Sequence, residues 1–145
     1  MQSFAAALEA LGEQLGIEGL SLDQQGCCRL VFDGARILEL RVAGAQRRFL
    51  LSARLSCTVS LSAQAEKKLL RANLWGAGTA GGWFALDEQG QACLQQDVLL
   101  DDGCPSMLMV KIEGMLNSLE TWERELQGMS AENLTDYLSH AARRV

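Results

Sequence analysis

The chain has 145 residues, of which 48% are hydrophobic and 21% are charged, and its formal net charge at pH 7 is −5. This length and apolar content suffice for a buried core without a metal ion or disulfide, so we expect one ordered domain over residues 1–145. The acidic balance argues against sequence-wide binding to nucleic acid, because an acidic surface repels phosphate groups.

The first residues do not resemble a signal peptide. Residues 1–16 have no basic leader, and Glu9 and Glu13 interrupt their apolar run. No apolar run in the chain reaches the roughly 18 residues that cross a bilayer. We therefore expect a cytoplasmic protein without a membrane span.

An amphipathic helix is predicted over residues 4–15, between a capping Ser3 and a terminating Gly16. Its apolar positions recur at helical spacing: Phe4, Leu8, Leu11 and Leu15. An irregular apolar connection then leads into a sheet.

Three antiparallel strands follow, joined by a turn at Asp33-Gly34 and a second turn near residues 43–45. Alternation places one set of side chains on a dry face: Cys28, Leu30, Phe32, Leu38, Leu40, Val42, Phe49, Leu51, Ala53 and Leu55. The opposite face is mostly polar, and its apolar exceptions are Val31, Ile37 and Leu50. Exposed apolar side chains on a polar face are explained if a bound partner covers them.

A second helix is predicted over residues 63–74, followed by a glycine-rich stretch from Gly76 to Gly81. The apolar side of this helix is formed by Leu69, Leu70, Asn73 and Leu74. The glycines match the dinucleotide fingerprint G-x-G-x-x-G, which requires a strand before it and a helix after it. Here a helix precedes the glycines and an aromatic strand follows them. We therefore interpret the glycines as a helix-to-strand connection and not as a phosphate site.

Two more strands are predicted over residues 83–86 and about 92–99. The longest helix starts near Pro105 and is predicted to end at Gly128. The predicted architecture is α+β in the order α-β-β-β-α-β-β-α, with a twisted, mostly antiparallel sheet.

The predicted core spans about residues 4–127, and residues 128–145 form a tail. A short helix is predicted in the tail from Ser130 to Ala142, with Leu134, Tyr137 and Leu138 as its apolar side.

The cysteines do not form a recognisable site. They are Cys27, Cys28, Cys57, Cys93 and Cys104. Without a C-x-x-C pair, and with His140 as the only histidine, we expect no metal ion and no cofactor. The enzymatic alternative is a reactive Cys104 near a helix start, although Asp101 and Asp102 would raise the pKa of its thiol.

One block of sequence brings up a family resemblance. From Leu69 to Asp87, a helix ending in Leu-x-x-Asn-Leu runs through the glycines into the aromatic strand. The residues that carry this pattern are Leu70, Asn73, Leu74, Gly81, Gly82, Trp83 and Phe84. Together with the element order over about residues 4–127 and the long last helix with Trp122, the chain resembles class I type III secretion chaperones of the Tir-chaperone (CesT/SycE-like) family.

This resemblance implies a homodimer without catalytic activity. Such a dimer binds the N-terminal segment of one or more secreted effectors and keeps them secretion-competent in the bacterial cytoplasm, with the secretion-system ATPase as a further partner. In such families the second helix and the strand after it form the dimer contact. Here that contact corresponds to Leu69, Leu70, Asn73, Leu74, Trp75 and Trp83. Trp75 has few local neighbours to bury it, and aromatic residues are enriched at interface centres.

The resemblance also places effector contacts on the first helix and the strands, through apolar pockets and strand addition. The corresponding residues are Phe4, Leu8, Leu11, Leu30, Phe32, Leu38 and Leu40. Val31, Ile37 and Leu50 join them as apolar residues of the polar face. For the dry-face residues, and for Leu69 and Phe84, the alternative is an ordinary role in the core.

Two other functions remain open at this point. A protein of the same fold can sequester a regulator and so control secretion genes, in which case its partner is retained in the cell and not exported. The other alternative is a cysteine-dependent enzyme at Cys104.

Overall fold

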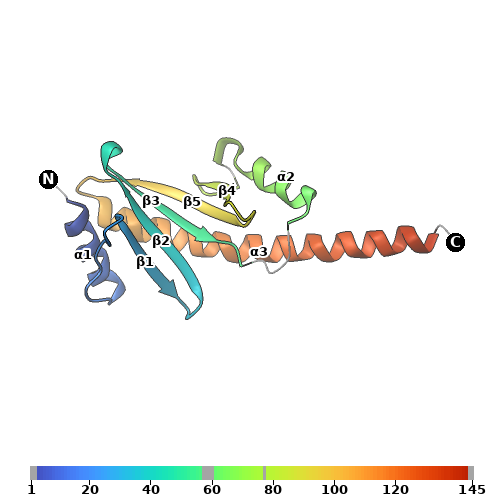
Figure 1. The fold of residues 1–145 in the computed structure, drawn as a ribbon, viewed down its shortest axis with the longest axis horizontal. Helices are drawn as coiled ribbons and strands as arrows, with labels where there is room; N and C mark the ends of the chain where they lie inside the picture. The colour runs from blue at the N-terminus through green and yellow to red at the C-terminus, as the bar shows by residue number, and fades with distance from the viewer. Residues whose placement is uncertain (1–2, 57–60, 77, 144–145) are drawn as a thin grey trace.

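The computed structural model describes residues 3–56, 61–76 and 78–143, with side chains as far as residue 127. The helices and strands follow one another in the predicted order (Figure 1): α1 Phe4–Leu15, β1 Cys27–Phe32, β2 Arg36–Ala43, β3 Arg48–Arg54, α2 Ala63–Ala72, β4 Trp83–Leu86, β5 Ala92–Leu99 and α3 Cys104–Arg143.

The strands form one sheet in the order β1-β2-β3-β5-β4, and every neighbouring pair is antiparallel. The predicted α+β class is therefore confirmed. α3 runs along one face of the sheet with α1 beside its first turns, while α2 lies next to β4 and away from α1 (Figure 1).

The core lies between this face of the sheet and the helices α1 and α3. Its largest fully buried apolar side chains come from all three: Leu8, Leu11, Leu38, Leu40, Phe49, Leu51, Leu94, Leu108, Ile112, Met115 and Leu119. The alternation in the strands and the stripe at helical spacing in α3 point to the same interior. Burial of this shared apolar surface is the main force that holds the layers together.

Local sequence signals set most element boundaries. The Ser3 hydroxyl accepts the amide of Ala6, and Gly16 closes α1 in a left-handed conformation with φ 72°. Asp33 and Gly34 both have positive φ, of 53° and 76°, as the tight turn between β1 and β2 requires.

The second helix is shorter than predicted. α2 ends at Ala72 and not at Leu74. Its cap residue, Asn73, uses its side chain to bind the main chain of Phe84. Trp75 then adopts φ 59°, a left-handed conformation that a right-handed helix cannot contain.

The last helix is longer than predicted. α3 continues through Gly128 to Arg143, so the prediction of a helix end and a separate tail helix is wrong. One glycine costs an α-helix only about 1 kcal/mol. The residues Met-Ser-Ala-Glu that follow include no proline to stop the helix. The tail side chains Leu134, Tyr137 and Leu138 lie outside the described side chains.

An ion pair ties the start of β2 to α3. Arg36 donates to both oxygens of Glu123, from Nη1 to Oε1 at 2.7 Å and from Nη2 to Oε2 at 2.9 Å. The amide of Ser56 donates to the same Oε1 at 3.0 Å. These donors lower the pKa of the Glu123 carboxyl from 4.5 to about 2.

This ion pair predicts a specific pH dependence. Because the pKa of Glu123 is lowered in the folded state, its contribution is fully present above about pH 4.5 and is lost as the pH falls toward 2. We expect Glu123→Gln to lower the free energy of unfolding at neutral pH by about 3 kcal/mol and to flatten the acid limb. Urea titrations at a series of pH values measure both effects. A variant that keeps the acid slope of the wild type would show that Glu123 is not the titrating group.

Candidate partner-binding surfaces

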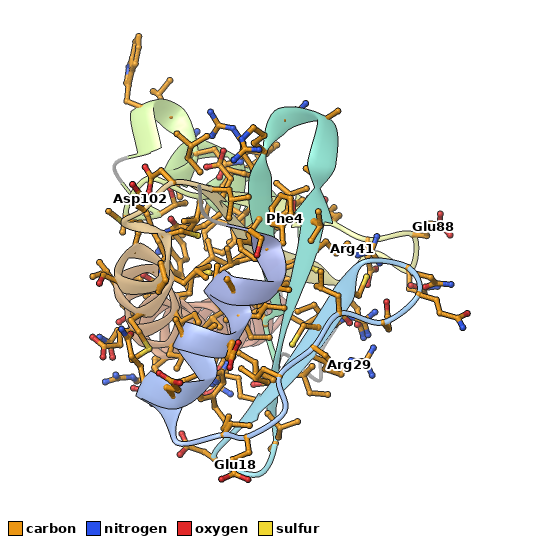
Figure 2. All side chains as sticks on the ribbon, turned by 90° about the vertical axis from the view of Figure 1, so that its left-hand side faces the viewer. Phe4, Glu18, Arg29, Arg41, Glu88 and Asp102 are labelled. Atoms are coloured by element: carbon orange, nitrogen blue, oxygen red, sulfur yellow. The ribbon has the colours of Figure 1, made fainter. Side chains whose placement is uncertain are left out.

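The outer face of the sheet, opposite to α3, is covered mainly by charged side chains. Arg29 donates to Glu39 at 3.0 Å across β1 and β2. Arg48 pairs with Asp97 across β3 and β5. Arg29 and Arg41 project from β1 and β2 on the side away from α1 (Figure 2). This polarity agrees with the alternation in the sequence, so the exposed apolar side chains on this face stand out.

The apolar exceptions on this face form two groups. Val31 and Ile37 are 55% and 44% exposed and are direct cross-strand partners. We call these two residues the hairpin pair. Leu50 is 38% exposed and lies elsewhere, because its partners are Arg41 on β2 and Asp97 on β5. The structure therefore brings together two of the three residues that the sequence picked out on this face.

Five residues predicted to contact an effector lie in the core. Their exposed fractions are between 0% and 2%: Leu8, Leu11, Leu30, Leu38 and Leu40. A partner on the folded surface cannot reach these side chains, so their burial corresponds to the core alternative. Phe4 and Phe32 are half-buried, and Phe4 packs edge-on against Phe49 with 5.0 Å between the ring centroids.

A second apolar surface lies on α2 and β4. Its four side chains, which we call the α2–β4 patch, are Leu70 at 68% exposure, Leu74 at 64%, Trp75 at 93% and Leu86 at 49%. A pocket of about 110 Å³ opens between α2 and β4. Its walls are formed by Glu66, Leu69, Leu70, Phe84, Ala85 and Leu86. Three residues of the predicted dimer contact thus share one exposed surface.

The other three residues of the predicted dimer contact also hold the fold together. Leu69 is 3% exposed. The Phe84 amide donates to Asn73 Oδ1 at 2.7 Å, and Asn73 Nδ2 donates to the Phe84 carbonyl at 3.1 Å. Trp83 Nε1 donates to Gln95 Oε1 at 2.8 Å. Asn73 therefore fixes the end of α2 to the edge of β4 through both atoms of its amide group.

The family model of the Tir chaperone protein (CesT) family matches residues 6–123. The chain belongs to this family. The match begins within α1 and ends within α3, so it includes every strand of the sheet, the hairpin pair and the α2–β4 patch. The resemblance inferred from the sequence is thereby confirmed. No curated protein matches the sequence.

Solved structures share the fold of this CesT-family chain. A chain of the ExsC–ExsE complex has a TM-score of 0.73 and 24% identity over 83% of this chain and 90% of that one. A chain of the HopA1–SchA chaperone–effector complex has a TM-score of 0.70 and 24% identity over 81% and 91%. The Yersinia pestis type III secretion chaperone SycH, in complex with a stable fragment of YscM2, has a TM-score of 0.69 and 18% identity over 83% and 99%. At these identities the likeness establishes the fold.

The described amides in and next to the glycine-rich stretch bind carbonyl groups nearby in the chain. Gly78 donates to the carbonyl of Ala72, Gly81 to that of Gly76, and Gly82 to that of Thr79. A phosphate-binding loop needs free amides at the start of a helix. Here the stretch leads into β4, which agrees with its interpretation as a helix-to-strand connection.

The thiol of Cys104, on which the enzymatic alternative depends, is fully buried at the start of α3. Burial raises the pKa of this thiol, and the nearby carboxylate of Asp101 raises it further, as predicted. The nucleophilic thiolate is therefore disfavoured at this position. Cys57 lies outside the described residues.

The described side chains include no group of three or more His, Cys, Asp or Glu residues that could hold a metal ion. The described helices also include no apolar stretch long enough to span a membrane.

Sequence reasoning missed two exposed apolar residues of the sheet. Leu86 and Leu99 are 49% and 48% exposed at the ends of β4 and β5. Leu99 lies diagonally from Leu50, whose direct partner is Asp97. The alternation of Gln95, Asp97 and Leu99 carried the same signal that identified Val31, an apolar residue in a polar series. Leu86 had no such signal, because its exposure depends on how α2 lies against β4.

Proposed function

We propose that this chain is a class I type III secretion chaperone that acts as a homodimer in the bacterial cytoplasm. It binds the N-terminal segment of one or more secreted effectors, keeps them secretion-competent and carries out no catalysis. Membership of the CesT family carries this proposal. The HopA1–SchA complex, in which a chaperone of the same fold holds an effector, supports it.

The outer face of the sheet is our candidate for the effector-binding surface. An extended segment laid across it covers the hairpin pair and Leu50, whose burial contributes affinity without disturbing the core. The charged neighbours Arg29, Glu39 and Arg41 then form a polar rim, which is the usual anatomy of a protein interface.

The two edges of the sheet differ in a way that favours strand addition at β1. On β4, both main-chain groups of Phe84 are already bound by the Asn73 amide. On β1, the amide of Cys27 donates to Asp23 Oδ1 at 2.9 Å, and the amide of Asp23 donates to the carbonyl of Cys27 at 2.8 Å. Beyond Cys27, β1 continues as an edge strand through Arg29 and Val31, and Val31 belongs to the hairpin pair. An effector strand that pairs there gains main-chain hydrogen bonds and apolar contacts together.

The α2–β4 patch is our candidate for the homodimer contact. Four large apolar side chains exposed on α2, the residues that follow it and β4 are costly on a monomer in water. A second copy that presents the same patch covers them on both chains at once, as a two-fold interface requires.

The test is co-purification combined with secretion. The tagged chain is expressed in its native host, its mass is measured by light scattering, and bound proteins are identified. The proposal expects a dimer of the 15.8 kDa chain that retains a secreted protein only when that protein keeps its N-terminal segment. Deleting the gene should reduce secretion of that protein and leave other substrates unaffected. A partner that is never exported would instead support the regulator-sequestering alternative, and binding to the purified secretion ATPase tests the further partner.

A further inference from the structure

Trp75 combines two unfavourable features. Its side chain is 93% exposed, and its backbone adopts φ 59° and ψ 11°. A left-handed backbone is uncommon for any residue except glycine, and a bulky residue in it indicates either strain or a function. An indole held in water by a strained backbone therefore suggests that its binding partner lies outside the single chain.

Hydrogen bonds hold the segment that follows Trp75 in place. Trp122 Nε1 on α3 donates to the carbonyl of Gly78 at 3.0 Å. Thr79 is fully buried, and its hydroxyl donates to the carbonyl of Gly82 at 2.6 Å. The first bond ties the glycine-rich stretch to α3, and the second closes the turn between Thr79 and Gly82. Trp75 is consequently presented on a firm support and not on a loose loop.

The same surface contains a pocket of suitable chemistry. The opening between α2 and β4, of about 110 Å³, is bordered by Leu70, Phe84 and Leu86 on its apolar walls and by Glu66 at its rim. Nothing in the described chain fills it. A projecting indole and an apolar pocket on one surface are self-complementary, and an indole N–H can find an acceptor in a carboxylate at the rim.

We propose that, in the homodimer, Trp75 of each chain inserts into the α2–β4 pocket of the other, so that neither pocket is complete without the partner. This inference rests on the homodimer of the proposed function. Its geometry follows from packing the two α2 helices antiparallel around Leu70. The end of α2, after which Trp75 projects, then lies beside the first turns of the second α2, near Glu66 at the rim of its pocket.

The first test removes the projecting side chain. We expect Trp75→Ala in the full chain to raise the dimer dissociation constant at least thirtyfold, because buried aromatic anchors dominate interfaces. The melting temperature of the monomer should be unchanged or higher, and Trp75→Gly should raise it further by relieving the backbone strain. Sedimentation equilibrium and circular dichroism measure the two quantities. An unchanged dissociation constant overturns the inference.

The second test separates insertion from a general role in the interface. Leu86→Trp enlarges a side chain of the pocket wall, on an edge strand that tolerates aromatic residues, and should weaken the dimer as Trp75→Ala does. Neither variant homodimer then has an intact contact. In a heterodimer of the two variants, the chain that keeps Trp75 can insert it into the unaltered pocket of the Trp75→Ala chain, so one of the two contacts is intact. The heterodimer should therefore form at least fivefold more tightly than either homodimer. A mixture with no preference for the heterodimer overturns insertion.

The fluorescence of Trp75 gives an independent readout. The wild-type emission minus that of Trp75→Phe isolates this indole from Trp83 and Trp122. We expect it to become shielded from an aqueous quencher as the concentration rises through the dissociation constant. A dimer in which Trp75 stays open to the quencher overturns the inference and leaves the homodimer standing. A wild-type chain that is monomeric at all concentrations overturns both.

Discussion

Replacing Val31 with Glu and Ile37 with Lys in one variant is expected to weaken effector capture roughly thirtyfold or more. Burying both half-exposed apolar side chains under a partner is worth about 2 kcal/mol, and every 1.4 kcal/mol is tenfold in affinity. The free protein should lose little, because the new charges are opposite in sign and lie directly across from each other on β1 and β2. Capture of the co-expressed client and thermal melting of the free chain measure the two effects.

The matched control lies on the other face of the sheet. Leu51 is fully buried on β3. Leu51→Ala should cost about 2–5 kcal/mol of unfolding free energy, as core truncations do, while capture below the melting temperature persists. If the Val31/Ile37 variant captures its client normally, the outer face is not the effector-binding surface.

Sequence patterns predicted the strands well because period-two alternation directly encodes which face is buried. Every dry-face residue from Cys28 to Leu55 points inward or lies at its margin. The same alternation isolated Val31 and Ile37 on the outer face. In this antiparallel sheet one face packs against the core and the other contacts water, so the sequence of each strand shows which of its side chains point inward.

Helical patterns were less informative about the candidate interface. The apolar side predicted for the second helix included Leu69, Leu70 and Leu74, but the structure buries only Leu69 and leaves the other two more than 60% exposed. A stripe at helical spacing shows that a face is apolar and not what covers it. The pocket beside Leu70 was beyond sequence reasoning altogether, because it depends on how far α2 stands from β4.

The residues carried over from the family illustrate the same limit. Leu38 and Leu40 look apolar and strand-like in sequence whether they bind a partner or fill the core. Their complete burial favours a role in the core, and it follows from α1 and α3 covering that face. Asn73 shows a second limit, because its place near the end of a helix gave no indication that its side chain would bind the main chain of β4.

Gly82→Ala is the second substitution with a large expected effect, and it tests whether the glycines have a structural role. A methyl group at Gly82 would lie 2.3 Å from the carbonyl oxygen of Gln95 and 2.7 Å from Cγ of Gln96. The nearer atom belongs to the main chain of β5 and cannot move aside without breaking the pairing with β4. We expect a loss of about 3 kcal/mol in the free energy of unfolding, at the upper end of overpacking costs. Chemical denaturation measures it.

Gly114→Ala provides the contrast, because the glycine lies inside α3 and an added methyl group meets nothing within 4 Å. There the substitution should stabilise the protein by roughly 0.5–1 kcal/mol, the usual advantage of alanine over glycine in a helix. The two substitutions are therefore expected to change the free energy of unfolding in opposite directions. If Gly82→Ala were tolerated as well as Gly114→Ala, the close approach of β4 and β5 at Gly82 would be wrong. The support that presents Trp75 to a partner would then be looser than the hydrogen bonds from Trp122 to Gly78 and from Thr79 to Gly82 indicate.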